Sequence, residues 1–269
     1  MVFLGRRFKI ACVQFDSVGK AKDQILAEAE EYVSEASAEG CRLICFPEYF
    51  PGFGSIGELR RLAEPIPGPL TDAMSNLAKK YRVYLAFGVV EESDGKLYDT
   101  AVILDNEGKI VLKYRKIHLF DALNVKESQV FEAGDSPSTI LEVNGWHIAV
   151  SICYDIRFPE LPRLLAVRGM NLLLVPTAWF SGPFKEAHLE TILKTRALEN
   201  GIYVAASCQI GGPFTGGTCI VDPFGVVVAR GLEKPCLVTA WISLDRVDHV
   251  REALPMLKHR RPEVYEGLI

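Results

Sequence analysis

The chain has 269 residues, of which 49% are hydrophobic and 24% are charged, a composition typical of a globular protein with a substantial core. Its formal net charge of −4, without a run of basic residues longer than two, argues against a nucleic-acid or membrane-surface partner. No apolar stretch reaches the ~18 residues that a membrane-spanning helix needs.

Strands and a helix alternate along the first part of the chain. Residues 8–15 and 41–48 are apolar runs that predict buried strands, and 83–90 predicts a third. Between the first two, residues 23–39 have apolar side chains at helical spacing, and Gly40 marks the end of that helix. The alternation of strand and helix favours an α/β protein.

The later part of the chain adds hairpins, each around a short polar turn. The turns are predicted at Asn106–Gly108, at Asn144-Gly145 and at Asp222–Gly225. Further predicted elements are helices at 161–168 and 186–199 and strands at 171–176, 202–207 and 236–242. Antiparallel hairpins combined with the alternating first half predict mixed sheets with helices outside, in one domain over residues 1–269.

The cysteines and the N-terminal residues indicate the compartment. Seven cysteines are spread from Cys12 to Cys236 without a dense framework, and residues 1–10 carry their apolar side chains before their charges, unlike a signal peptide. These features predict reduced thiols in a cytoplasmic protein. Cys41 and Cys45 have no second pair or nearby histidine, so we expect no structural metal.

Three reactive side chains each follow a predicted strand. They are Glu48 after LICFP, Lys116 after IVLKYR and Cys153 after HIAVSI. Taken singly, each has an ordinary structural interpretation: a turn-forming carboxylate, a solvated lysine and a core thiol. Because active sites of α/β proteins gather where strands end in loops, the three together predict one site.

These three residue types are sufficient for hydrolysis of an amide or a nitrile. A thiol with a pKa of about 8.5 needs a base near neutral pH, and Glu48 can take its proton. Attack on a carbonyl creates an oxyanion, which Lys116 and a backbone N–H in the turn after Cys153, such as that of Tyr154, can stabilise. This chemistry requires no metal and no organic cofactor.

Longer motifs extend the pattern over nearly the whole chain. In order, they are LICFPEYF, KYRKIHLF, EAGD, ICYDIRFPEL, VPTAW, TRALENGIYV, GTCIVDPFG and LKHRRPEVY. This ordered set resembles the nitrilase, or carbon–nitrogen hydrolase, superfamily. The resemblance implies an α-β-β-α sandwich of two mixed sheets flanked by helices.

The resemblance also assigns roles to individual residues. It makes Cys153 the nucleophile, Glu48 the general base and Lys116 the electrostatic partner of the intermediate. Many members use a second glutamate between the lysine and the cysteine. Glu127 matches best, with Glu132 as the competitor, and its implied role is to hold Lys116 and the substrate amide in place.

Other residues are candidates for the pocket around the thiol. Tyr154, Trp179 and Phe120 are predicted to bind substrate, although large aromatics also serve as core. Arg157 could bind a substrate carboxylate, but we expect it to pair with an acidic residue of the chain. His118 suggests a catalytic triad, yet Glu48 already fills the role of base, so we expect His118 to be structural.

The implied activity is that of an amidase acting on a small-molecule amide. It would convert a small linear amide into a carboxylic acid and ammonia through a cysteine thioester. An N-carbamoyl amine or amino-acid hydrolase would use the same residues. True nitrilases are usually longer and carry Trp-Glu after the nucleophile, whereas this chain has Tyr154-Asp155. The intact set of three reactive residues argues against a non-catalytic interaction module.

The resemblance further implies a homodimer or an assembly of dimers. Residues 255–269 form the predicted C-terminal arm, and Leu254, Met256 and Leu257 are its candidate apolar contacts, either with a partner or within the chain. The physiological amide depends on the shape of the pocket, which loops set.

Overall fold

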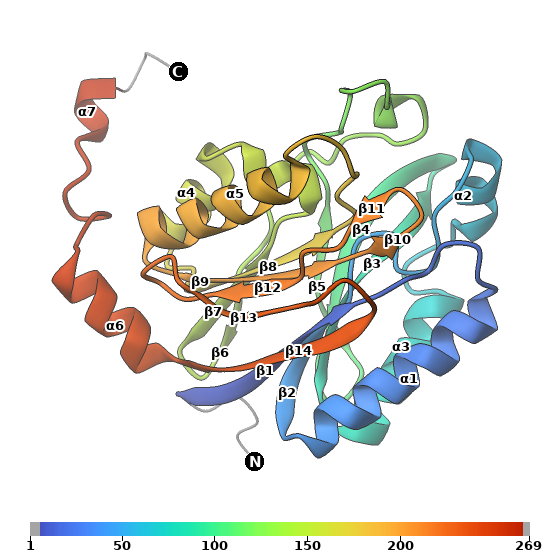
Figure 1. The fold of residues 1–269 in the computed structure, drawn as a ribbon, viewed down its shortest axis with the longest axis horizontal. Coiled ribbons are helices and arrows are strands. Elements are labelled where there is room, and N and C mark those ends of the chain that lie inside the picture. The colour runs from blue at the N-terminus through green and yellow to red at the C-terminus, as the bar shows by residue number, and fades with distance from the viewer. Residues whose placement is uncertain (1–5, 266–269) are drawn as a thin grey trace.

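The computed structural model describes residues 6–265 and contains two six-stranded sheets packed between layers of helices (Figure 1). The predicted α-β-β-α sandwich is therefore confirmed. Two short stretches lie outside the described residues. They are residues 1–5, which were part of the argument for a cytoplasmic protein, and residues 266–269, which end the predicted C-terminal arm.

The first sheet has the strand order β14–β1–β2–β3–β4–β5. β2 pairs in parallel with β1 and β3, and the other neighbours are antiparallel. The strands are β1 (Arg7–Gln14), β2 (Cys41–Cys45), β3 (Tyr84–Ser93), β4 (Lys96–Leu104), β5 (Ile110–Arg115) and β14 (Cys236–Ser243). Parallel strands are covered on both faces, which explains their continuous apolar runs.

The second sheet repeats this arrangement in the order β13–β12–β9–β8–β7–β6. β8 pairs in parallel with β7 and β9, and antiparallel strands complete both edges. The strands are β6 (Leu141–Val143), β7 (Trp146–Val150), β8 (Leu172–Thr177), β9 (Tyr203–Cys208), β12 (Cys219–Val221) and β13 (Val227–Arg230). A separate two-stranded ribbon joins β10 (Ile210–Gly211) to β11 (Phe214–Thr215).

Helices cover the outer face of each sheet, as Figure 1 shows. α1 (Lys22–Ala38) and α3 (Pro69–Tyr81) pack on the first sheet, and α4 (Glu160–Val167) and α5 (Lys185–Asn200) lie over the second. The remaining helical segments are α2 (Ile56–Leu62), α6 (Leu244–Ala253), α7 (Pro262–Tyr265) and the 3₁₀ helices η1 (Glu127–Gln129) and η2 (Cys153–Arg157).

The central core lies between the sheets and joins side chains of both. Ile10 and Leu43 of the first sheet and Ile148 and Leu173 of the second belong to one buried cluster. Burial of such apolar area is the main force that holds the layers together. The cluster thereby fixes the relative position of the strand ends that carry the reactive residues.

The predicted strands, hairpins and helices are observed with shifts of a few residues at their ends, but α2, α3, α6, α7 and the β10–β11 ribbon were not predicted. Pro69 occupies the first turn of α3, where a missing N–H costs nothing. Leu70, Met74 and Leu77 then bury one face.

The C-terminal segment leaves the sandwich through α6 and reaches α7 at some distance from the sheets (Figure 1). Leu257 packs against the central core, so this residue of the predicted arm makes an intrachain contact. Val264 on α7 is 60% exposed. Among residues 6–265, no helix is long and apolar enough to cross a membrane.

Candidate active site

The ends of four strands meet on one side of the sandwich. Glu48 follows β2, Lys116 follows β5, Cys153 follows β7 and Ala178 follows β8. The structure thus brings together the three residues that the sequence singled out. Ala178 was not singled out, and it connects the two sheets because its backbone N–H donates to Glu48 Oε2 over 2.6 Å.

The Lys116 ammonium group lies at the centre of a buried cluster of three carboxylates. Its Nζ is 2.7 Å from Glu48 Oε1, 2.9 Å from Glu127 Oε2 and 3.1 Å from Asp99 Oδ2. Burial favours the neutral amine, but the three carboxylates outweigh it and raise the pKa of Lys116. The raised pKa suits Lys116 to stabilise an anion as a cation and makes it a poor base.

Glu48 is held by backbone as well as by Lys116. Its own carbonyl oxygen accepts a hydrogen bond from Gln209 Nε2 over 3.1 Å. Gly88 of β3 lies so close that a Cβ there would be 2.8 Å from Glu48 Cα. A glycine is required at this position because no side chain fits between the two strands. The backbone of Glu48 is thus held in place, and its carboxylate is oriented by Lys116 Nζ and the Ala178 N–H.

Glu127, at the start of η1, is the second glutamate in contact with Lys116. Its Oε1 accepts from Tyr49 Oη over 3.1 Å, and its Oε2 accepts from the Phe120 backbone N–H over 2.7 Å. Its competitor, Glu132, is exposed, and its carboxylate lies 3.8 Å from Lys96 Nζ. The structure therefore brings Glu127 into the cluster and leaves Glu132 outside it.

Cys153 begins η2 with an unusual backbone. Its φ of 43° lies in the left-handed region, which non-glycine residues rarely adopt and which often occurs at functional turns. Burial and the nearby Glu48 carboxylate raise the pKa of the thiol, although Lys116 opposes them. The resting thiol is thus protonated and needs a base. Within residues 6–265, the Tyr154 backbone N–H donates no hydrogen bond.

Asp155, which the sequence marked only as part of the Tyr154-Asp155 pair, anchors the turn after the nucleophile with its side chain. Its buried carboxylate accepts from the Ile152 backbone N–H over 2.9 Å and from Tyr114 Oη over 2.7 Å. It also lies 2.8 Å from His118 Nδ1. His118 stacks on Phe158, so its contacts are structural, as expected. The clue in the sequence was an acid two residues after the cysteine.

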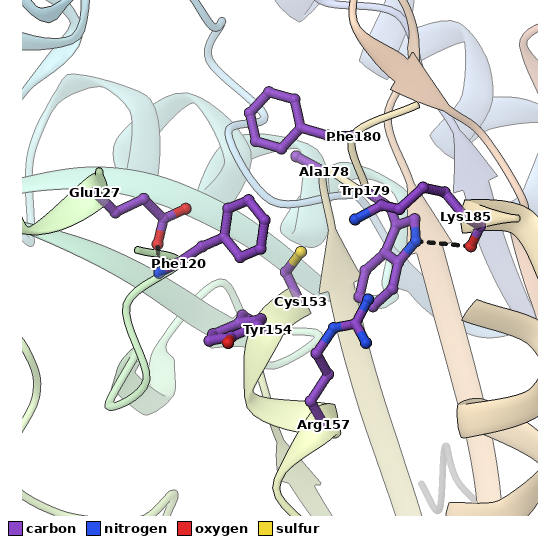
Figure 2. Close-up of a pocket in the computed structure, with 9 residues that line it drawn as sticks. All are labelled: Phe120, Glu127, Cys153, Tyr154, Arg157, Ala178, Trp179, Phe180 and Lys185. Atoms are coloured by element: carbon purple, nitrogen blue, oxygen red, sulfur yellow. Dashed lines mark hydrogen bonds between the residues drawn. The ribbon is translucent and has the colours of Figure 1, made fainter. Parts of the chain in front are cut away.

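A small pocket opens above the thiol, and all predicted pocket residues line it. Figure 2 shows the Cys153 sulfur pointing between the rings of Phe120 and Trp179. The pocket is narrow, with about 260 Å³ of space that includes the open solvent at its mouth, and this suits a small substrate. The lining residues are Phe120, Glu127, Cys153, Tyr154, Arg157, Ala178, Trp179, Phe180 and Lys185.

Two cations in this pocket lie against Trp179. The Arg157 guanidinium carbon is 4.5 Å from the centre of that ring, and Lys185 Nζ is 4.7 Å from it (Figure 2). Lys185 is only 5% exposed. Burial and the nearby Arg157 charge lower the pKa of Lys185. Lys185 was not selected from the sequence, because it lies 32 residues from Cys153 and just before the predicted helix at 186–199.

The expected pairing of Arg157 with an acidic residue is wrong. Among residues 6–265, neither Arg157 nor Lys185 forms an ion pair with a carboxylate. The guanidinium lies on the Trp179 ring instead, since a cation is attracted to an aromatic face. Two positive side chains are thus available to an anion that enters the pocket.

The three carboxylates of the cluster also have a spacing that could suit a metal ion. Oxygens of Glu48, Asp99 and Glu127 lie within 4.8 Å of one another. Lys116 Nζ, however, contacts all three of these groups. The ammonium group occupies the position that a cation would take, and it supplies the positive charge there.

Comparisons with known proteins give the family of the chain. Residues 9–252 match the family described as carbon-nitrogen hydrolase. The chain is 34% identical to omega-amidase NIT2 of Xenopus tropicalis over 272 residues, which covers 96% of this chain and 97% of the relative. It is also 40% identical over 172 residues to the deaminated glutathione amidase of Escherichia coli O157:H7, which covers 64% of this chain and 65% of that protein.

A solved structure supports the same relationship. Nit3 of Saccharomyces cerevisiae, described as a member of branch 10 of the nitrilase superfamily, superposes with a TM-score of 0.85 at 28% identity. The match covers 97% of this chain and 99% of that one. Both the sequence and the fold are therefore shared over nearly the full length.

Proposed function

This chain belongs to the carbon–nitrogen hydrolase family and is an amidase, and we propose that Cys153, Glu48, Lys116 and Glu127 carry out the hydrolysis. The observation that supports this assignment is the buried contact of Lys116 with both glutamates, one of which lines the pocket together with Cys153. The substrate is a small linear amide, and the products are a carboxylic acid and ammonia.

The reaction begins with attack on the amide carbonyl. Glu48 takes the thiol proton as the Sγ–carbon bond forms, and the carbonyl electron pair moves to the oxygen. The resulting oxyanion is stabilised by the Lys116 ammonium and by the Tyr154 N–H, which has no acceptor among the described residues. Glu127 holds Lys116 in place for this role.

The second half of the cycle restores the thiol. The oxyanion collapses, the carbon–nitrogen bond breaks, and the nitrogen takes the proton from Glu48 and leaves as ammonia. Glu48 then accepts a proton from water as the hydroxide adds to the thioester. Collapse of the second intermediate expels the thiolate, which recovers that proton, and the acid is released.

The substrate carries an anionic group beyond the scissile amide, as an ω-amide of a dicarboxylic acid does. Arg157 and Lys185 support this assignment because both are cations in the pocket without a carboxylate partner among residues 6–265. An incoming carboxylate would complete charge-assisted hydrogen bonds with them. The names of two relatives, an omega-amidase and a deaminated glutathione amidase, point in the same direction.

Removal of the thiol tests the mechanism. Cys153→Ala should lower kcat for ammonia release by at least about 10⁴-fold, because the nucleophile acts together with its base. Cys236→Ala is the matched control, since this thiol is outside the pocket and should be dispensable. Mass spectrometry of the wild type, quenched during turnover, should find the acyl group on Cys153. Turnover by a folded Cys153→Ala variant would refute the assignment.

Removal of one pocket cation tests the substrate class. Lys185→Met should reduce kcat/KM for an ω-amide about 10- to 100-fold, the usual value of a lost charge-assisted hydrogen bond. The same variant should discriminate far less between that compound and an uncharged amide of equal length. Lys194→Met, an exposed lysine on the same helix, is the control. A panel that includes N-carbamoyl compounds and nitriles completes the test. Faster turnover of either class would overturn the assignment of an ω-amide as substrate.

The enzyme is further proposed to act as a cytoplasmic homodimer in which residues 255–269 contribute to the interface. The exposed side chain of Val264 and the position of α7 away from the sheets support a partner contact there (Figure 1). Seven free cysteines suit a reducing compartment. Light scattering should give the mass of two chains for the full protein and of one for Val264→Glu. A monomeric wild type would refute the dimer.

A further inference from the structure

Asp99 is a third carboxylate in the Lys116 cluster that the proposed reaction does not use. It lies on β4 and is 1% exposed. Its Oδ2 is 3.1 Å from Lys116 Nζ, and its backbone oxygen accepts the Lys116 N–H over 2.8 Å. Asp99 therefore positions both ends of the lysine without lining the substrate pocket.

The three carboxylates differ in the donors that reach them. Each oxygen of Glu48 and Glu127 accepts at least one directed hydrogen bond. Neither oxygen of Asp99 accepts a hydrogen bond from any residue between 6 and 265. Directed donors stabilise a carboxylate anion, so the negative charge is least supported on Asp99.

The total charge of the cluster leads to the same residue. Three ionised carboxylates around one ammonium would leave two uncompensated negative charges in a buried site, at a large cost in free energy. One bound proton removes half of this excess. We propose that Asp99 holds this proton in the resting enzyme and positions Lys116 as a neutral carboxylic acid.

The groups that face Asp99 explain why its proton serves the reaction. Its neighbours are the ammonium of Lys116, the carboxylates of Glu48 and Glu127 and the phenol of Tyr49. Burial raises the pKa of Asp99, and the two glutamates add to the effect while Lys116 opposes it. With the proton on Asp99, Glu48 remains ionised and is ready to accept the proton of the thiol.

Loss of the Asp99 proton at high pH should inhibit the enzyme. A second uncompensated negative charge in the cluster would weaken the pull of Lys116 on the oxyanion and make the Cys153 thiol harder to ionise. The proton on Asp99 therefore sets part of the alkaline limb of the activity profile. This inference rests on the proposed roles of Glu48 and Cys153.

Asp99→Asn tests the inference because the amide imitates a neutral carboxyl group. The alkaline limb of kcat/KM should move upward by about one pH unit or more, since the group that titrates is gone. Glu91→Gln is the matched control, a buried carboxylate outside this cluster, and it should leave the limb in place. An unchanged limb in a folded Asp99→Asn variant would overturn the proposal.

Infrared spectroscopy detects the proton on Asp99 directly, without a measurement of enzyme activity. The wild type at neutral pH should show the carbonyl band of a buried carboxylic acid, and Asp99→Asn should lack it. If Asp99→Asn fails to fold, pH titration of the wild-type band decides, because an ionised Asp99 would give no such band at neutral pH. The absence of the band refutes the proton on Asp99, whereas an active Cys153→Ala variant would refute the proposed function.

Discussion

Two charge clusters meet at strand β4, and they are built differently. The Lys116 cluster consists of Lys116, Glu48, Asp99 and Glu127. The Glu91 cluster consists of Glu91, Thr100, Lys113 and Arg115. Thr100 and Arg115 directly adjoin Asp99 and Lys116 in sequence, and neighbouring residues on a strand face opposite sides.

The Glu91 cluster has more donors than its one carboxylate needs. Arg115 binds Glu91 with two nitrogens, at 2.9 and 2.7 Å, while Lys113 and Thr100 lie at 3.0 and 2.7 Å. Burial opposes ionisation, but these donors outweigh it and lower the pKa of Glu91. Four donor atoms fill the acceptor sites of this one carboxylate, so the cluster is a saturated structural network.

The Lys116 cluster has the opposite balance, three carboxylates for one cation. Its negative excess leaves a carboxylate free to accept a proton from the Cys153 thiol, and it keeps Lys116 charged. The comparison teaches that burial of charge is not by itself a sign of function. An unbalanced cluster beneath a pocket is the more informative feature, because catalysis needs a group whose protonation can change.

The largest expected difference between the clusters concerns their cations. Lys116→Met should reduce kcat/KM by about 10³-fold or more, since it removes the partner of the oxyanion and strands three carboxylates. Arg115→Met, the matched variant, should keep most of the activity, because Lys113 and Thr100 still reach Glu91. Ammonia release and thermal unfolding measure the two effects. Equal losses of activity in Lys116→Met and Arg115→Met would contradict the assignment of a catalytic role to one cluster and a structural role to the other.

A smaller effect is expected from the second glutamate. Glu127→Gln should lower kcat/KM about 10²-fold, because the charge that holds Lys116 is lost while the shape is kept. Glu132→Gln should have no measurable effect on activity, since Glu132 is exposed and outside the cluster. If only the Glu132 variant loses activity, the assignment of the second glutamate is wrong.

The two clusters should also make the free energy of unfolding depend on pH in opposite ways. The lowered pKa of Glu91 means that its stabilisation is present above its unfolded value near 4.3 and is lost as pH falls through its folded pKa. The raised pKa of Asp99 means that its destabilisation grows as pH rises above about 3.9, the unfolded value.

Urea unfolding across pH tests this contrast. Glu91→Gln should flatten the loss of unfolding free energy on the acid side. Asp99→Asn should reduce the fall in unfolding free energy that accompanies rising pH. It should therefore make the protein more stable at neutral pH than the wild type. The exposed Glu132→Gln variant serves as a control. If both variants changed the unfolding free energy on the same side of the pH profile, the proposed difference in charge balance would be wrong.

The smallest expected effect belongs to the exposed cation of the Glu91 cluster. Lys113 is 40% exposed, and surface ion pairs contribute less than about 1 kcal/mol. Lys113→Gln should therefore change the unfolding free energy by less than Arg115→Met does, and it should leave activity intact. A larger loss for Lys113→Gln would mean that the bidentate arginine is not the main partner of Glu91.

Local patterns in the sequence were enough for most strands and turns. Asn144 and Gly145 both have positive φ, as the two-residue turn between apolar runs predicts. Glu48, Lys116 and Cys153 were selected because each follows a strand and lies in a recognisable motif. Such signals are short in range, so they identify residues without stating their distances.

Features that depend on distant partners were missed or wrong. Lys185 belongs to the pocket only because the N-terminal end of α5 lies beside Trp179. Arg157 contacts the ring of Trp179 and no acid among residues 6–265, which its own motif did not reveal. Asp99 lies within a strand that looked like ordinary structure. In each case the decisive neighbour comes from another element.

The sequence by itself determined the succession of strands and helices along the chain, the family resemblance and the residue types available for hydrolysis. Only the tertiary structure decided how the charges combine. Lys116 and Glu48 are 68 residues apart, yet 2.7 Å separates their charged atoms. Electrostatic energies and pKa values depend on such distances and on burial, and folding sets both by packing the two sheets together.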